Sequence, residues 1–203
     1  MFSIIQAAGW PIWPLIVASV IALAIIAERL WSLRASVVMP AGLLTHAVQE
    51  YRQNGASPAS LTKLADGSAL GQVLAAGIKN IKSSPEVVKE SIEEAGRAVA
   101  ANLERFLTTL GTIAAIAPLL GLFGTVIGMI EIFGATSPTG NSNPTQLAHG
   151  ISIALYNTAF GLVVAIPSMI FYRHFRGKID NILLDMEMQG TKLVEVLHGE
   201  RQA

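Results

Sequence analysis

Three long apolar segments run through the chain, and polar stretches separate them. The residues from Trp13 to Trp31 are mostly apolar, and the first charged side chain of the chain is Glu28. A second apolar segment covers residues 106–133, and a third covers residues 150–172. A helix needs about 20 mostly apolar residues to cross a bilayer. Each segment therefore predicts a transmembrane helix.

The first segment has tryptophan at both ends, with Trp10 and Trp13 before it and Trp31 at its close. Tryptophan is enriched where a membrane helix meets the interface. Pro11 and Pro14 stand where the helix begins, a position that tolerates proline. No Lys or Arg precedes the apolar run, whereas a cleaved signal peptide begins with a basic region. The pattern favours an uncleaved first span within residues 1–34.

Residues 35–105 are more polar, and their pattern predicts a small helical region in water. Val38-Met39-Pro40 should end the first helix, and the stretch from Asn54 to Pro58 has the composition of a turn. Apolar residues recur at helical spacing in the pieces between these breaks. The expected helices are Leu43–Arg52, Ser60–Ala65 and Ala69–Asn80.

The next helix should begin with Ser84 as its N-cap and Pro85 at its first position. Charged residues then alternate with apolar ones at helical spacing, and no strong breaker separates them from the apolar run. The pattern predicts one helix over residues 86–133. At about 1.5 Å per residue it would be roughly 70 Å long, about twice the thickness of a bilayer. Its first half should project into water.

The third long helix should open at Asn143-Pro144-Thr145, after a loop over residues 134–149. Beyond Tyr172 the sequence becomes basic and amphipathic while the apolar spacing persists, so the helix should continue into water over residues 173–203. Pro118 and Pro167 lie inside the second and third spans and should kink them. The predicted fold is an all-α membrane protein. It has three transmembrane helices, two of them extended into long cytoplasmic helices, and a small helical cytoplasmic region.

Basic residues near the ends of the spans predict the orientation. Cytoplasmic segments of membrane proteins carry an excess of Lys and Arg. The N-terminal tail and the 134–149 loop contain neither residue, which places both in the periplasm. The basic residues cluster at the other end of every span: Arg29, Arg34, Arg97, Arg105, Arg173, Arg176 and Lys178.

Composition agrees with a membrane protein and excludes several other classes. Of the 203 residues, 52% are apolar and 14% charged, and the mean hydropathy is +0.52. Soluble domains have about a quarter of their residues charged. The net charge of zero argues against a nucleic-acid-binding surface. The chain has no cysteine, no GxSxG or HExxH motif, and four scattered histidines. We therefore expect no enzyme activity, no metal and no cofactor.

Glycines recur along one part of the second span, at Gly121, Gly124 and Gly128, and Gly161 lies in the third span. The step from Gly124 to Gly128 is a GxxxG motif, which lets membrane helices approach closely. The motif is not a phosphate-binding loop, because no Gly-Lys-Ser/Thr follows it. We expect these glycines to serve helix packing.

Polar side chains lie beside these glycines. Thr125 is next to Gly124, while Asn157 and Thr158 precede Gly161. Two threonines at similar depth in consecutive antiparallel spans could form a polar seam. The alternative is that each threonine bonds only to a carbonyl of its own helix.

Glu131 is the only acid between Phe106 and Tyr172. An acid within a span is a candidate for function, although Glu131 is close enough to the end of its span to reach the interface and be hydrated. The middle of the seam therefore holds hydroxyl groups but no titratable group. If protons cross here, a partner protein would have to supply the carboxylate.

Two stretches resemble the TolQ/ExbB/MotA proton-channel family, and most of all its ExbB branch. They are APLLGLFGTVIGMIEIF and NPTQLAHGISIALYNTAFGLVVAIPSMIFY. The resemblance implies three spans with the N-terminus outside, and five subunits around a pair of single-span ExbD-type helices. It also implies that an aspartate of the partner takes up and releases the proton. By motif, Thr125 and Thr158 would face that aspartate.

One position departs from the family pattern, because Ile153 stands where ExbB and TolQ commonly have a glutamate. The expected function is a proton-channel subunit in the bacterial inner membrane. With an ExbD-type partner and a TonB-type protein, it would use the proton motive force to drive import across the outer membrane. The alternatives are a TolQ-like subunit for envelope maintenance, a structural scaffold without proton conduction, and a stand-alone channel.

Overall fold

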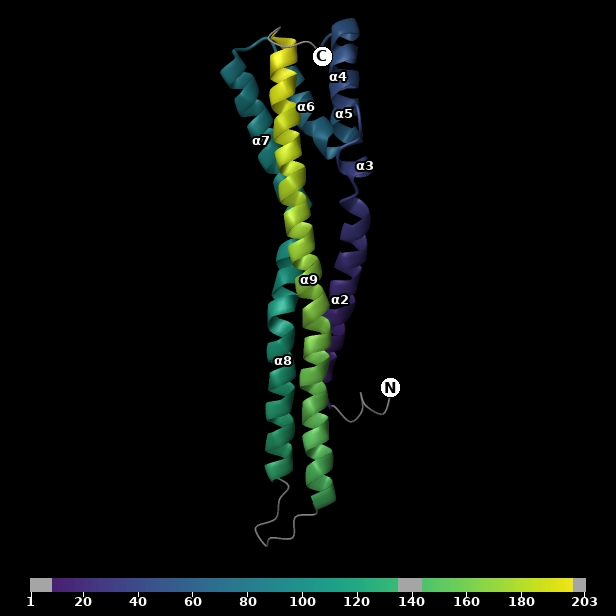
Figure 1. Ribbon diagram of the computed structural model, residues 1–203, viewed down its shortest axis with the longest axis vertical. Coiled ribbons are helices and arrows are strands. Elements are labelled where there is room, and N and C mark those ends of the chain that lie inside the picture. Colours follow the sequence, from purple (N-terminus) through teal and green to yellow (C-terminus); the bar gives the residue numbers. More distant parts are fainter. Residues whose placement is uncertain (1–8, 135–143, 199–203) are drawn as a thin grey trace. The chain divides into compact units, whose positions relative to one another are not determined.

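The computed structural model describes residues 9–134 and 144–198. Every regular element in this part of the chain is a helix. In chain order the helices are α2 (Ile12–Ser32), α3 (Ala35–Val38), α4 (Leu43–Asn54), α5 (Pro58–Gly67), α6 (Ala69–Lys79), α7 (Pro85–Glu104), α8 (Leu107–Gly134) and α9 (Pro144–Leu197) (Figure 1).

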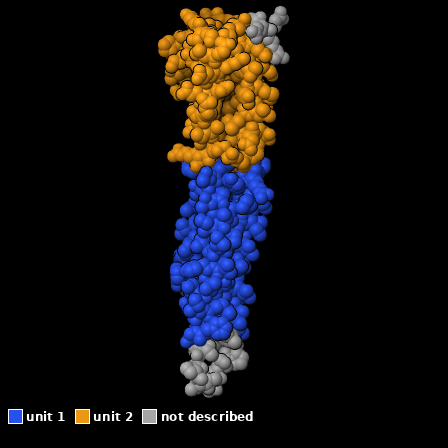
Figure 2. Space-filling view, turned by 90° about the vertical axis from the view of Figure 1, so that its left-hand side faces the viewer, with its two compact units in different colours: residues 1–28, 106–174 blue, residues 29–105, 175–203 orange. Residues whose placement is uncertain are grey.

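Three stretches are long and apolar enough to cross a membrane: Ile12–Ser32, Pro85–Gly134 and Gly150–Leu197. The last two are about twice as long as a bilayer needs, because each continues an apolar part with a polar one. The expected fold class is thereby confirmed. The chain divides into two compact units, residues 1–28 with 106–174 and residues 29–105 with 175–203 (Figure 2).

The first unit contains most of α2, all of α8 and the first part of α9. Its buried core joins the three helices through Leu15, Ala117, Val164 and Ala165. Trp10, just before α2, packs edge-on against Phe123 of α8, with ring centroids 6.1 Å apart. Many side chains of these helices that lie outside the core are apolar and exposed, as expected for helices that meet lipid.

The second unit packs α4 to α7 with the last part of α9. Two glycines let α9 pack closely against α6 and α7. A Cβ atom on Gly77 would lie 2.8 Å from Leu193 Cδ2, and one on Gly190 would lie 2.8 Å from Ile92 Cγ2. Because Ile92 and Leu193 are buried, the unit has an apolar core of its own.

Several predicted helix boundaries match the structure. α4 covers Leu43–Asn54, Ser84 is the N-cap residue of α7 with Pro85 following it, and α9 begins at Pro144. Two N-caps were not predicted from the sequence. Ser57 Oγ accepts a hydrogen bond from the N–H of Ser60, and Ser68 Oγ accepts one from Gly71. Both satisfy a backbone donor that the first turn of a helix leaves unpaired.

The first helix ends earlier than predicted. α2 stops at Ser32, before Val38-Met39-Pro40, and α3 is a separate turn. The cause is the backbone of Arg34, which is extended at φ −69° and ψ 136° and turns its carbonyl away from the helix axis. The guanidinium of Arg34 lies over the ring of Trp31, 4.4 Å from its centroid.

The predicted single helix over 86–133 is interrupted, because α7 ends at Glu104 and α8 begins at Leu107. Arg105 keeps helical dihedral angles, but its N–H bonds to the carbonyl of Asn102, three residues back. The carbonyl of Leu103, in the last turn of α7, accepts a hydrogen bond from Arg29. Pro118 lies inside α8 and Pro167 inside α9, and their kinks stay predictions.

Candidate functional site

The backbones of α8 and α9 approach each other where both carry glycine. A Cβ atom on Gly161 would lie 2.6 Å from the carbonyl oxygen of Ala117. One on Gly121 would lie 2.8 Å from the carbonyl oxygen of Asn157 and 3.0 Å from the Cα of Thr158. Side chains essentially never reach such distances, so only glycine fits at these two positions.

The close packing continues along α8 in steps of one turn. A Cβ on Gly124 would lie 2.7 Å from both Cβ and Cγ of Asn157. A Cβ on Gly128 would lie 3.3 Å from the Cβ of Ala154. Asn157 is 1% exposed, so its amide occupies the space that Gly124 leaves open. We call this contact between α8 and α9 the glycine seam; its members are Gly121, Gly124, Gly128, Ala154, Asn157, Thr158 and Gly161.

Thr125 is half-buried and directly follows Gly124 of the seam. Its hydroxyl donates a hydrogen bond of 2.6 Å to the carbonyl of Leu122 in the same helix. Thr125 therefore bonds to a carbonyl of its own helix, which was the alternative to a polar seam. Because a hydroxyl has one proton and two lone pairs, Thr125 Oγ1 can still accept a hydrogen bond from another molecule.

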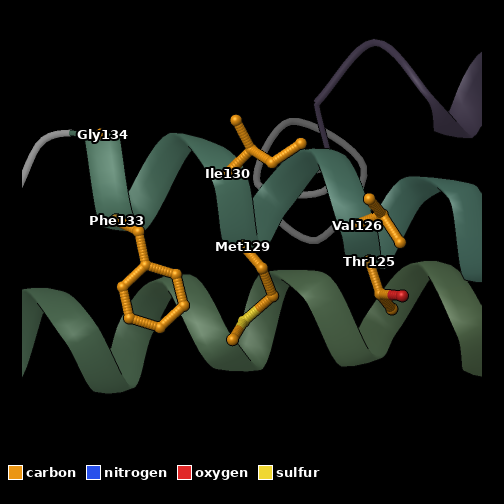
Figure 3. A pocket seen from close by; sticks show the side chains of 6 residues that line it. All are labelled: Thr125, Val126, Met129, Ile130, Phe133 and Gly134. Carbon is orange, nitrogen blue, oxygen red and sulfur yellow. The ribbon is translucent and has the colours of Figure 1, made fainter.

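An open groove of about 620 Å³ begins at Thr125 and runs along α8 toward its end. Figure 3 shows Thr125, Met129 and Phe133 on the same side of the helix, one turn apart. The other lining residues are Val126, Ile130 and Gly134. Met129 and Phe133 were not predicted as site residues, although their spacing of four and eight residues from Thr125 places them on its face of α8.

Thr158 is half-buried, and its backbone lies against Gly121, one turn of α8 before Thr125. The structure thus brings Asn157 and Thr158 against the glycines of α8. Glu131, in contrast, is exposed near the end of α8. The side chain of Ile153 lies outside the described part of the chain, as do residues 135–143 of the predicted loop.

These features define a class of protein. It is a helical, multi-pass membrane protein in which two apolar helices pack through glycine beside hydroxyl and amide groups. Residues 65–188 match the sequence profile of the MotA/TolQ/ExbB proton channel family. The match covers more than half of the 203 residues, so the chain belongs to this family.

Curated relatives carry names from two branches of the family. The chain is 34% identical to the biopolymer transport protein exbB1 of Vibrio cholerae over 170 residues, which cover 81% of this chain and 74% of that protein. It is 34% identical to ExbB of Aquifex aeolicus over 123 residues, or 61% and 70% of the two chains. It is 31% identical to the Tol-Pal system protein TolQ of Pseudomonas aeruginosa over 144 residues, or 66% and 60%. The family and the apolar helices identify a multi-pass protein of the bacterial inner membrane.

Proposed function

We propose that this chain is the proton-channel subunit of an ExbB-type motor complex. It would work with a single-span, ExbD-type partner and use the proton motive force to drive TonB-dependent import across the outer membrane. The observation that supports the proposal is the glycine seam, which holds Asn157 and Thr158 against α8 next to Thr125. The similarity to proteins named ExbB supports the choice of system.

The chemistry of the seam suits a partner that brings its own carboxyl group. The described seam residues are glycine, alanine, threonine and asparagine, none of which titrates. The Thr125 hydroxyl already donates its hydrogen bond to the carbonyl of Leu122, which leaves its oxygen as an acceptor. A neutral carboxylic acid donates one hydrogen bond, whereas a carboxylate only accepts. Thr125 would therefore favour the protonated form of a partner's acid over the charged form.

The proposed assembly has five copies of this chain around a pair of partner helices, with a TonB-type protein carrying the work outward. The N-terminus would lie in the periplasm and the C-terminus in the cytoplasm. Two observations support this orientation. The segments that would be periplasmic contain no Lys or Arg, and the polar ends of Pro85–Gly134 and Gly150–Leu197 carry the basic residues.

The test compares Thr125→Val and Thr158→Val in cells that co-express the partner and in liposomes with the purified complex. Valine keeps the shape but removes the oxygen, so both variants should assemble normally and lose most proton flux and energised uptake. Thr125→Ser restores the oxygen and should recover most of the activity. Thr191→Val, which removes an exposed hydroxyl with the same own-carbonyl bond from α9, is the matched control. Normal uptake by both seam variants would contradict the proposal.

Close packing alone favours a second candidate, a scaffold that assembles a complex without conducting protons. In that case the threonine variants would behave as wild type, and Gly124→Leu would prevent assembly. A stand-alone channel would instead show proton flux in liposomes without any partner. A TolQ-like role would appear as rescue of an envelope defect rather than rescue of uptake.

A further inference from the structure

A partly open cavity of about 390 Å³ lies within the second unit, where the segment between α3 and α4 meets the C-terminal half of α9. It is lined by residues 39–45, by Leu70 of α6, and by Gln189 and Lys192 of α9. All of these residues belong to the second unit. Sites for small molecules are usually clefts of about 300–1,000 Å³, so the cavity is large enough for a small ligand.

Three of the lining side chains carry hydrogen-bond donors. Gln189 and Lys192 are three residues apart on α9 and therefore share one face of that helix. The third is Thr45, in the first turn of α4. Within residues 9–134 and 144–198, none of these three side chains makes a hydrogen bond or a salt bridge. The ammonium of Lys192 and the amide of Gln189 are thus available to a ligand that accepts hydrogen bonds.

Most of the other lining residues are apolar. Leu70 is only 3% exposed, and Leu43 and Leu44 are half-buried. Met39 and Pro40 complete this part of the wall. The described lining residues include no aromatic ring, so the wall offers no stacking surface to a ring in the ligand. Leucine and the flexible, unbranched methionine suit an aliphatic chain instead.

We propose that this cavity binds a small carboxylic acid with a short aliphatic chain. The Lys192 ammonium would pair with the carboxylate, and the Gln189 amide would donate a hydrogen bond to it. The chain would lie against Leu43 and Leu44. The proposal does not rest on proton conduction or on the identity of the partner protein.

The charge of the lining decides which anions fit. Lys192 is the one cation among the described lining residues, and none of them is an Asp or a Glu. A phosphate monoester carries about two negative charges near neutral pH, of which Lys192 would match only one. An amino acid would bring an ammonium group that meets no carboxylate in the lining. A monocarboxylate with an apolar chain therefore fits both parts of the cavity.

Protection of Lys192 from acylation tests the proposal with the full chain in detergent micelles. A water-soluble reagent acylates exposed lysines, and mass spectrometry gives the rate at Lys192 relative to that at Lys63. Lys63 is exposed on α5 and does not line the cavity, so it reports any general effect of the ligand on the reagent or the micelle. Saturating hexanoate should slow acylation of Lys192 several-fold and leave Lys63 unchanged.

Two further ligands separate the contributions of charge and chain. Hexan-1-ol has the same chain without the negative charge, so it should not protect Lys192. Each methylene group that the cavity buries should tighten binding about fourfold, so butyrate should need a concentration roughly fifteen times higher than hexanoate for the same protection.

Variants test the two polar groups. Gln189→Met keeps the length of the side chain but removes the amide donor, and should weaken protection by hexanoate roughly three- to tenfold. Gln49→Met, on the exposed surface of α4, is the matched control and should behave as wild type. Equilibrium dialysis of labelled hexanoate, at equal micelle content, should show that Lys192→Gln loses most of the bound ligand and that Lys63→Gln retains it. Circular dichroism establishes that each variant is folded.

Four outcomes would overturn the site. Equal slowing at Lys192 and Lys63 would mean a general effect of the ligand. Equal protection by hexan-1-ol would mean that the carboxylate is not recognised. Unchanged protection in Gln189→Met, or equal loss of labelled hexanoate in the two lysine variants, would mean that the ligand does not lie between Gln189 and Lys192.

Discussion

Arg29 Nη1 donates a hydrogen bond of 2.9 Å to the carbonyl oxygen of Leu103, at the last turn of α7. The final carbonyls of a helix lack partners within the helix, and a cation near them is favoured by the helix dipole. Arg29 is only 6% exposed, so the contact is made away from bulk water. The bond ties residues 74 positions apart within the second unit.

Removal of this contact should destabilise the protein. Arg29→Gln takes away the charged donor and leaves a nearly buried carbonyl less well satisfied, which should cost about 2 kcal/mol, since hydrogen bonds to charged groups contribute about 1.5–3 kcal/mol. The measurement is chemical unfolding in detergent micelles. Arg52→Gln on the surface of α4 should change the stability much less, and a similar loss in both variants would count against a specific role for Arg29.

Gly124 should not tolerate even a methyl group. In Gly124→Ala the new Cβ would meet Asn157 at 2.7 Å, and the buried amide has little room to move. Overpacking of this kind costs about 1–3 kcal/mol. Gly177→Ala is the matched control in α9, because nothing lies within 4 Å of its Cβ position. Alanine should be neutral there or stabilise by up to about 1 kcal/mol. Unfolding in micelles should therefore show a loss of stability in Gly124→Ala and none in Gly177→Ala, and an equal loss in both variants would contradict the packing argument.

The ion pair between Arg176 and Glu104 should matter little in physiological salt. The two groups are 3.1 Å apart, but their side chains are 49% and 34% exposed. Solvent screens such pairs, and their typical contribution is about 0–1 kcal/mol. Glu104→Gln should therefore lower the stability slightly at low ionic strength and not measurably near molar salt. An effect that persists at high salt would show that Glu104 acts by something other than this pair.

Glu86, in the first turn of α7, should make the stability depend on pH in the acid range. Hydrogen bonds from its own backbone N–H and from the Ser84 hydroxyl lower the pKa of its carboxyl below 4.5, the usual value. Because the pKa is lower in the folded state, the stabilisation is present above the unfolded-state pKa and is lost as the pH falls through the folded-state pKa.

Ser84→Ala should raise the pKa of Glu86 toward its usual value, since the serine hydroxyl is the second largest cause of the shift. NMR titration of the Glu86 side chain measures this directly. Ser83→Ala, one residue earlier, is the control. If Ser84→Ala left the titration unchanged, the Ser84 hydroxyl would not contribute to the lowered pKa of Glu86.

Much of the fold could be predicted from the sequence because helices in membranes have simple requirements. Backbone groups must bond within each span, so about 20 apolar residues are enough to indicate a helix. Ser84 and Pro85 predicted the start of a helix, and α7 begins there. The interruption at Arg105 was not predicted, because no glycine or proline marks it in the sequence.

The candidate site, too, could be predicted only in part from the sequence. Glycine spacing indicated that α8 could approach another helix, but not that Gly124 would face Asn157 rather than another residue of α9. Helical periodicity places Met129 and Phe133 on the same side of α8 as Thr125, so their position along the groove could have been predicted from the sequence. That the Thr125 hydroxyl bonds to Leu122 depends on its rotamer, which sequence does not specify.

The sequence by itself determined the number of spans, their lengths and the family, since these depend on local composition and motif. Tertiary structure decided which glycine meets which residue across α8 and α9, and which of two nearby arginines is buried. Both outcomes depend on the rotation and register of packed helices, and these are set by the fit of many side chains at once. Ala114–Phe133 is thus recognisable from sequence as an apolar, glycine-rich span, but its glycine seam exists only where α9 places Asn157 and Gly161 against it.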